Sequence, residues 1–225
     1  MNKSALLLVG SPRREKSNSK SLGDYLLKSL SKKGLETRTI QIYDSLKSKE
    51  NIEELIKAVN KHDLIIIAAP LYVDSIPASV IKALEIIYEN RKNNVPDKKQ
   101  SLISIVNCGF PESYHNNTAT SIYKYFAKKA KFNWKGGLSL GQGEAIGNKP
   151  LEKLGWLVRN VKKSLDISAD CLAKDEEISQ NAIFLMSKSM IPGWIYLAVG
   201  TIQWKRLAKK NGVFQKLNDC PYIQS

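Results

Sequence analysis

The order of apolar and polar positions predicts strands and helices that alternate along the first 168 residues. Short apolar runs predict strands at 5–9, 35–42, 63–69, 101–107 and 132–140. Apolar residues at helical spacing predict helices at about 20–34, 51–60, 77–90, 114–128 and 151–167. The run at 64–67 is apolar on both faces, as in the middle of a parallel sheet. The pattern therefore predicts an α/β fold, with a parallel sheet covered by helices on both faces.

The loop after the first predicted strand contains the first candidate chemistry. It reads Gly-Ser-Pro-Arg-Arg-Glu-Lys-Ser-Asn-Ser over 10–19, with hydroxyl and amide donors and two arginines. A helix N-terminus that follows such a loop favours a phosphate, which Arg13 or Arg14 would neutralise. A surface loop whose Ser17, Asn18 or Ser19 only caps the helix explains the same residues. The loop has neither the G-x-G-x-x-G nor the P-loop pattern.

Phosphate binding directly after the first strand favours the strand order 2-1-3-4-5, in which ligands lie beyond strands one, three and four. The loop after strand three, at 70–77, offers Tyr72, apolar side chains and backbone amides. The loop after strand four, at 107–112, offers Gly109 and Phe110. Each aromatic alone is explained by ordinary packing and the glycine by a tight turn. Together the three loops predict a site for a phosphate that carries a flat ring.

Charge and cysteine content narrow the class of protein. The 225 residues are 43% hydrophobic and 25% charged, with a net charge of +14. No nucleic-acid-binding motif accompanies that charge and the lysines are spread along the chain, so we expect no nucleic-acid partner. Cys108, Cys171 and Cys220 form no C-x-x-C pair and suit a reducing compartment. The start resembles no signal sequence, and the expected location is the cytoplasm.

Two short segments carry a family resemblance. Gly10-Ser-Pro-Arg13 with Ser17-Asn-Ser19, and Ala69-Pro-Leu-Tyr72 with Ile76-Pro-Ala78, resemble the NADPH-dependent FMN reductases of the flavodoxin-like superfamily. The resemblance covers roughly residues 1–168. It implies a flavodoxin-like fold, FMN as cofactor, NADPH or NADH as co-substrate, and a homodimer. The iron–sulfur flavoproteins are similar in outline, but residues 43–51 lack their cysteine cluster, so we expect no metal.

By position, the resemblance also implies which residues hold FMN. The phosphate ligands would be Ser11, Arg13, Ser17, Asn18 and Ser19. The ribityl chain and the ring would contact Pro70, Leu71, Tyr72, Val73, Asn107, Cys108, Gly109 and Phe110. A small residue beneath the ring is the expected role of Cys108, rather than a reactive thiol. His115 is a candidate proton donor, although a lone histidine there is more often part of the surface.

Three functions fit these features. The first is an FMN-dependent NAD(P)H oxidoreductase that reduces a small acceptor such as a quinone, a nitroaromatic compound or a flavin. The second is an FMN-binding electron carrier without its own substrate. The basic charge favours the first, because carriers that resemble flavodoxin are usually acidic, whereas NADPH is a polyanion. The third is a flavoprotein at a membrane surface.

The last part of the chain, 169–225, is predicted to be a helical extension of the domain 1–168. A helix is expected at 176–188, and a second from Pro192 to a stop at Gly212. The second helix is apolar most of the way round and ends in a basic cluster at 205–210. Such a helix packs on another surface. A second subunit or a lid over the flavin is preferred, with a membrane surface as the alternative.

Overall fold

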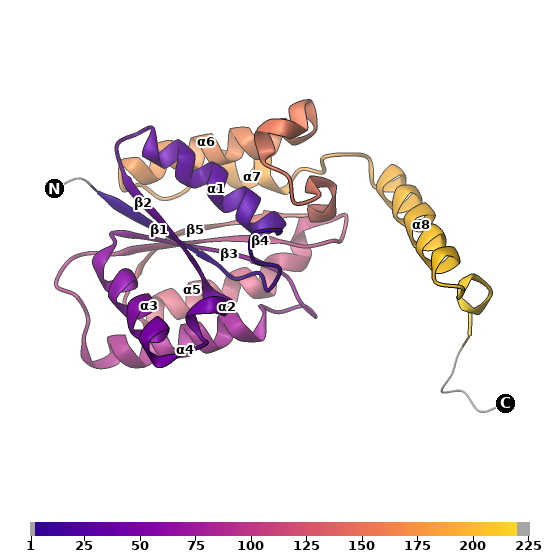
Figure 1. Ribbon diagram of the computed structural model, residues 1–225. Coiled ribbons are helices and arrows are strands. Elements are labelled where there is room, and N and C mark those ends of the chain that lie inside the picture. The colour runs from indigo at the N-terminus through magenta and orange to yellow at the C-terminus, as the bar shows by residue number, and fades with distance from the viewer. Residues whose placement is uncertain (1–2, 220–225) are drawn as a thin grey trace. The chain divides into compact units, whose positions relative to one another are not determined.

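The computed structural model describes residues 3–219 of the chain and contains one five-stranded sheet. Its strands are β1 (Ser4–Val9), β2 (Glu36–Gln41), β3 (Leu64–Pro70), β4 (Ser101–Asn107) and β5 (Asn133–Leu140). All neighbours are parallel, in the order β2-β1-β3-β4-β5 (Figure 1). The predicted flavodoxin-like α/β fold and its strand order are confirmed.

Eight α-helices occur in the described residues. They are α1 (Asn18–Ser31), α2 (Ile42–Ser45), α3 (Lys49–Lys61), α4 (Ala78–Asn93), α5 (Asn117–Lys129), α6 (Arg159–Ala173), α7 (Gln180–Ser187) and α8 (Gly193–Lys210). Four 3-10 helices accompany them: η1 (Ser113–Asn116), η2 (Gly143–Ile146), η3 (Leu151–Val158) and η4 (Phe214–Lys216). Helices α1, α6 and α7 cover one face of the sheet, and α2 to α5 cover the other (Figure 1).

Two predicted helices are divided in the structure, and one α-helix was not predicted. The segment 114–128 contains η1 followed by α5, and the segment 151–167 contains η3 followed by α6. Gly155 has a φ of 55°, which interrupts regular helix geometry within η3. The short helix α2 follows β2 directly. Four residues are too few for a helical apolar period, so the sequence pattern does not reveal α2.

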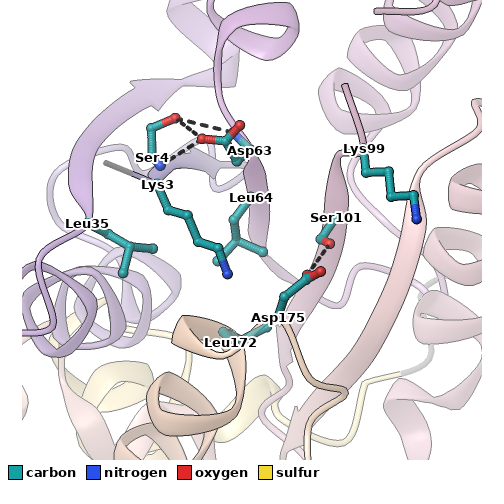
Figure 2. A pocket seen from close by; sticks show the side chains of 9 residues that line it. All are labelled: Lys3, Ser4, Leu35, Asp63, Leu64, Lys99, Ser101, Leu172 and Asp175. Atoms are coloured by element: carbon teal, nitrogen blue, oxygen red, sulfur yellow. Dashed lines mark hydrogen bonds between the residues drawn. The ribbon is translucent and has the colours of Figure 1, made fainter. Parts of the chain in front are cut away.

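Polar side chains tie the amino ends of the strands together (Figure 2). Asp63 accepts hydrogen bonds of 2.9 and 2.7 Å from the backbone N–H and the hydroxyl of Ser4, and its other oxygen accepts one of 2.9 Å from Lys98 Nζ. Ser101 donates a 3.2 Å hydrogen bond to Asp175. The first contacts join β1 to the residue before β3, and the last joins β4 to the turn after α6. Both sets lie at the amino ends of the strands.

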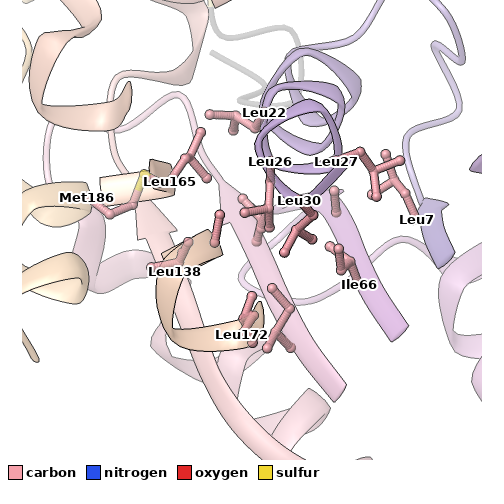
Figure 3. Close-up of a cluster of buried hydrophobic side chains, with 14 of the residues drawn as sticks. Leu7, Leu22, Leu26, Leu27, Leu30, Ile66, Leu138, Leu165, Leu172 and Met186 are labelled. Atoms are coloured by element: carbon pink, nitrogen blue, oxygen red, sulfur yellow. The ribbon is translucent and has the colours of Figure 1, made fainter. Parts of the chain in front are cut away.

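Two apolar cores lie on the two faces of the sheet. Alternate residues of β1 point into each core: Leu7 packs with α1 and α6, and Leu8 packs with α3, α4 and α5. Figure 3 shows the first core. Its labelled side chains are Leu7, Leu22, Leu26, Leu27, Leu30, Ile66, Leu138, Leu165, Leu172 and Met186. Burial on both faces explains the continuous apolar run of each central strand.

The first compact unit of the structure extends further along the chain than the predicted domain 1–168. The predicted boundary between residues 168 and 169 falls inside α6, and the first compact unit is Met1–Met190. After α6, the Ile178 N–H donates a 2.7 Å hydrogen bond to Lys135 O on the edge strand β5. Helix α7 then adds Ala182 and Met186 to the first core. The apolar residues of α7 complete the covering of this face, which explains the later boundary.

The second unit is Ile191–Ser225 and contains α8 and η4. Helix α8 ends as predicted, because Gly212 has a φ of 69° just after the last turn, and the Val213 N–H donates to Ala208 O. Within the described residues, no helix combines the length and apolar character needed to cross a membrane. Cys220 lies outside the described residues.

Candidate functional site

The three predicted loops meet in one hollow at the carboxyl ends of β1, β3 and β4. The lining residues are Ser11, Arg13, Ser17, Asn18, Ser19, Pro70, Leu71, Tyr72, Asn107, Cys108, Gly109 and Glu144. All predicted cofactor residues except Val73 and Phe110 are among them. The accessible volume of this open hollow is about 70 Å³, far below the roughly 300–1,000 Å³ of pockets that enclose a drug-sized ligand. A hollow of this size suits a small group such as a phosphate better than a whole ring system.

A larger hollow of about 150 Å³ lies at the opposite end of the strands, between Ser4, Asp63, Ser101 and Asp175. Its hydroxyl groups are already used, since Ser4 donates to Asp63 and Ser101 donates to Asp175 (Figure 2). These internal hydrogen bonds connect structural elements and leave few groups for a ligand. The hollow at the carboxyl ends is therefore the better candidate site, as expected for an open parallel sheet.

Ser17 is the N-cap of α1. Its backbone is extended, with a φ of −136°, and its hydroxyl accepts a 3.3 Å hydrogen bond from the Lys20 N–H. The same hydroxyl donates a 2.7 Å hydrogen bond to Arg14 O. The capping interpretation thus holds for Ser17, whose donor proton is used within the loop.

Ser19 and Asn18 connect the start of α1 to distant parts of the chain. The Ser19 hydroxyl donates a 2.8 Å hydrogen bond to Asn107 Oδ1, and both side chains are buried. Asn18 Oδ1 accepts a 2.8 Å hydrogen bond from the Asn148 N–H. Asn18 and Ser19 therefore fix the position of the helix N-terminus relative to β4 and the loop after β5.

Several donors of the loop remain available to an anion. The Ser11 hydroxyl accepts a 3.3 Å hydrogen bond from the Arg13 N–H but donates none within residues 3–219. The backbone N–H groups of Asn18 and Ser19 likewise have no acceptor among the described residues. Because these groups lie at the positive end of α1, they favour a bound phosphate.

The structure distinguishes the two arginines of the loop. Arg13 lines the hollow, and its guanidinium lies 3.7 Å from Glu144 Oε1. Arg14 has a φ of 52° and forms a 3.1 Å ion pair with Asp44. Its guanidinium also lies 5.0 Å from the centre of the Tyr43 ring. The side chain that can reach a phosphate in the hollow is therefore that of Arg13.

Glu144 was not predicted from the sequence. It lies in η2, after β5, and is exposed beside Arg13. The carboxyl ends of all strands of a parallel sheet meet at one edge, so the loop after the fifth predicted strand is also a candidate. The predicted strand order therefore could have indicated this loop, although not Glu144 itself. A carboxylate at this place makes the hollow less positive and competes with a phosphate for Arg13.

The loop after β3 forms a tight reverse turn. Tyr72 and Ser75 exchange backbone hydrogen bonds of 2.8 and 3.0 Å, and between them Val73 and Asp74 have φ angles of 48° and 58°. Two positive φ angles characterise a type I′ turn, which is unusual for a β-branched residue. Val73 is 98% exposed at the tip and does not line the hollow. Its predicted contact with the ring stays a prediction.

The loop after β4 places Cys108 beneath the hollow. The thiol is buried, and burial raises its pKa. The backbone of Cys108 is held by β5 and η2, because its N–H donates to Leu140 O and its carbonyl accepts from the Gly143 N–H. The raised pKa keeps the sulfur as a thiol at neutral pH, which fits a packing role for Cys108.

His115 is part of an aromatic stack beside the hollow. Its ring centre lies 4.2 Å from that of Phe110 and 4.4 Å from that of Tyr114. Its Nε2 atom lies 3.7 Å from Glu112 Oε2, a contact that becomes an ion pair when the histidine is protonated. His115 does not line the hollow. Its role as a proton donor stays a prediction.

Part of the chain matches a known protein family. Residues 4–109 match the family model of NADPH-dependent FMN reductase, which covers the first four strands, the loops after β1 and β3, and the start of the loop after β4. The resemblance predicted from the sequence is confirmed over that segment. The predicted FMN and nicotinamide agree with the description of this family. No curated protein matches the sequence significantly.

Solved structures share the fold at low sequence identity. An FMN-dependent NADH-azoreductase from Bacillus anthracis str. Ames Ancestor, in complex with FMN, is 15% identical, with a TM-score of 0.57 over 77% of this chain and 100% of its own. An apo NADH:FMN oxidoreductase is 15% identical, with a TM-score of 0.58 over 85% and 97%. An NADPH-quinone reductase from P. pentosaceus is 16% identical, with a TM-score of 0.53 over 74% and 97%.

Proposed function

We propose that this protein is an FMN-dependent NAD(P)H oxidoreductase that reduces a small acceptor such as a quinone, a nitroaromatic compound or a flavin. The observation that carries the proposal is the meeting of three loops in one hollow, with unused donors at the N-terminus of α1. The matching family and the similar reductases of known structure support the same activity.

In this proposal the donor set fits the phosphate of FMN. The Ser11 hydroxyl and the first N–H groups of α1 donate to its oxygens, and Arg13 neutralises its charge. Arg13 then exchanges its contact with Glu144 for the phosphate. Ser17 and Ser19 act mainly by holding the loop and the helix in place, through their hydrogen bonds to Arg14 O and Asn107.

The rest of the site positions a flat ring. Tyr72 and Leu71 approach from the loop after β3, and Gly109 approaches from the loop after β4. When bound, FMN supplies the hydride chemistry between a nicotinamide and the acceptor. The chain binds and orients the ring, and the shallow hollow leaves one face open to both substrates. The net charge of +14 favours the approach of NADH or NADPH, whose phosphate groups are negatively charged.

The two arginines provide a matched test of the phosphate site. We expect Arg13→Gln to weaken FMN binding about tenfold or more, because a charge-assisted hydrogen bond contributes roughly 1.5–3 kcal/mol. Arg14→Gln removes the same charge outside the hollow and should change the affinity less than about threefold. Fluorescence titration of the apoprotein measures both. Equal effects of the two substitutions would contradict the assignment of Arg13.

Riboflavin separates the phosphate from the ring. It lacks the phosphate, so wild-type protein should bind it more weakly than FMN, and Arg13→Gln should barely change its affinity. Anaerobic stopped-flow mixing of the FMN-loaded protein with NADPH or NADH then tests the reaction. We expect at least one of them to bleach the flavin rapidly. If neither did so while FMN still bound tightly, the electron-carrier function would replace the oxidoreductase.

A homodimer is part of this proposal. An open apolar groove between α4 and α5 is lined mainly by Ile81, Leu84, Tyr88, Ile122 and Tyr125, and it offers a surface for a second copy. Ile81→Lys places a charge in this groove. We expect sedimentation velocity to give a dimer for the wild type and a monomer for the variant. An unchanged dimer would exclude this groove as the interface.

A further inference from the structure

Helix α8 carries several large apolar side chains that are exposed. Trp194, Leu197, Trp204 and Leu207 are all more than half exposed. The helix belongs to the second compact unit, Ile191–Ser225. A soluble protein rarely exposes so many large apolar residues on one element unless the element binds another surface. The identity of that surface follows from the charge distribution of α8.

Charge is distributed unevenly along the axis of α8. Residues 193–203 contain no charged side chain, whereas Lys205, Arg206, Lys209 and Lys210 lie in the last six positions. The uncharged part is about 16 Å long at 1.5 Å per residue. This is about half the thickness of the apolar interior of a bilayer, so it can enter one leaflet but not cross both.

Apolar and basic residues also lie on different sides of the helix. Leu197, Trp204, Leu207 and Ala208 recur at helical spacing and share one face. The four basic residues lie on the opposite side. A helix with an apolar face, a basic face and tryptophans among its apolar residues is typical of a segment that lies in a membrane interface. Long lysine and arginine stems allow their charges to reach the lipid phosphates.

The net charges favour a lipid surface over a second copy of the chain. Residues 191–225 contain five Lys and Arg and one Asp, a net charge of +4, and residues 1–190 carry the remaining +10. A second copy presents the same excess of basic residues and offers no net opposite charge to the basic end of α8, whatever other surface joins two copies. An anionic bilayer presents the opposite sign, and each base near its surface strengthens binding.

We propose that α8 anchors this protein to the surface of anionic membranes, with the N-terminal half of the helix inserted more deeply than the basic half. The helix lies obliquely in one leaflet. Trp194 enters the acyl region, and Trp204 remains near the headgroups. Lys205, Arg206, Lys209 and Lys210 contact lipid phosphates.

Vesicle sedimentation of the full chain tests the attachment. We expect pelleting with vesicles that contain roughly one third phosphatidylglycerol, much weaker pelleting with pure phosphatidylcholine, and a marked loss at high salt. A chain that ends at Met190 retains the complete first unit and should stay in the supernatant. Equal pelleting of the two chains would overturn the proposal.

A matched pair of variants keeps the full chain. Lys205→Gln with Lys209→Gln removes two bases from α8 and should lower the partition coefficient about 25-fold, at about fivefold for each base. Lys57→Gln with Lys92→Gln removes the same charge from exposed positions of α3 and α4 and should change it little. Equal losses in both variants would show a general charge effect and contradict an anchor in α8.

Quenching by brominated lipid measures the depth of the helix. Full-length variants that keep only Trp194 or only Trp204, with the other tryptophans replaced by Phe, report each end. We expect stronger quenching of Trp194 by bromine in the acyl chains. Equal quenching would overturn the oblique orientation. If the chain 1–190 were a monomer, and the full chain were a dimer that did not pellet with vesicles, α8 would instead bind a second copy.

Discussion

The Ser19 hydroxyl donates a 2.8 Å hydrogen bond to Asn107 Oδ1, and this contact joins the first turn of α1 to the carboxyl end of β4. Both side chains are buried. The contact fixes the distance between the loop proposed to hold a phosphate and the loop proposed to hold a ring. A change in either residue is therefore expected to alter both stability and cofactor binding.

Ser19→Ala removes the donor and leaves Asn107 Oδ1 buried without its partner. We expect the free energy of unfolding of the cofactor-free protein to fall by about 1–3 kcal/mol. Urea denaturation measures the change. Ser21→Ala is the control, because its hydroxyl makes only a 3.3 Å contact with Ser17 O, and it should cost less than about 0.5 kcal/mol. Equal costs would mean that the contact with Asn107 contributes no specific stability.

Val73→Asn should stabilise the turn after β3. Val73 has a φ of 48°, a conformation that costs a β-branched residue roughly 1–2 kcal/mol and that asparagine adopts more readily. We expect the melting temperature to rise by roughly 2–4 °C. Val73→Ile retains the branched side chain and should give no increase. A decrease in the asparagine variant would show that the exposed valine makes a favourable contact that outweighs the strain.

Arg91 stabilises the interior through its guanidinium. The side chain is buried, donates a 2.6 Å hydrogen bond to Ala130 O, and lies 3.7 Å from the centre of the Phe132 ring. Burial lowers its pKa to about 10, so it stays protonated at neutral pH. Arg91→Ala should cost at least about 2 kcal/mol in chemical denaturation.

Arg38→Ala is the control for Arg91. Arg38 is exposed and pairs with Glu54, a contact expected to contribute less than about 1 kcal/mol. A similar small cost for both substitutions would mean that water or local rearrangement satisfies the groups left by Arg91.

Asp63 should make stability depend on pH in the acidic range. Burial acts to raise the pKa of Asp63, but hydrogen bonds from Lys98 and Ser4 outweigh it and hold the pKa below its ordinary value of 3.8. The contribution of this carboxylate is therefore complete above the unfolded pKa and is lost as the pH falls through the folded pKa. We expect the free energy of unfolding to decrease below about pH 4.

Asp63→Asn should flatten that decrease while lowering stability at neutral pH. Asp97→Asn changes an exposed carboxylate and should leave the pH profile close to that of the wild type. Urea denaturation at a series of pH values compares the three proteins. A wild-type slope in Asp63→Asn would assign the acid sensitivity to other carboxylates.

Much of the fold could be predicted because its signals are local. The run at 64–67 is apolar on both faces and could only be buried on both, and Ser17 precedes a periodic helix as an N-cap does. The predicted loops also gave most of the hollow, because strand order alone brings them to one edge. Gly155 is different. A positive φ is one of several conformations that glycine adopts, so the presence of a glycine at 155 does not by itself predict a break in the helix.

The partners of individual side chains could not be predicted in the same way. Arg13 and Arg14 are adjacent residues of the same type. Their side chains have different partners, because Arg13 lies beside Glu144 and Arg14 pairs with Asp44, and both partners are distant in sequence. The inclusion of α7 in the first compact unit could not be predicted for a similar reason. The sequence of α7 shows that the helix has apolar residues, but it does not show that they pack against α6 and β5.

The two ends of the sheet carry different kinds of polar residue, and this division has a consequence for variants found in living cells. At the amino ends, Ser4 and Lys98 both donate hydrogen bonds to Asp63, away from the hollow at the carboxyl ends. Changes there are expected to lower the amount of protein that escapes degradation, while each surviving molecule keeps its turnover rate. Changes at Arg13 should leave abundance unaltered and reduce the output of every molecule.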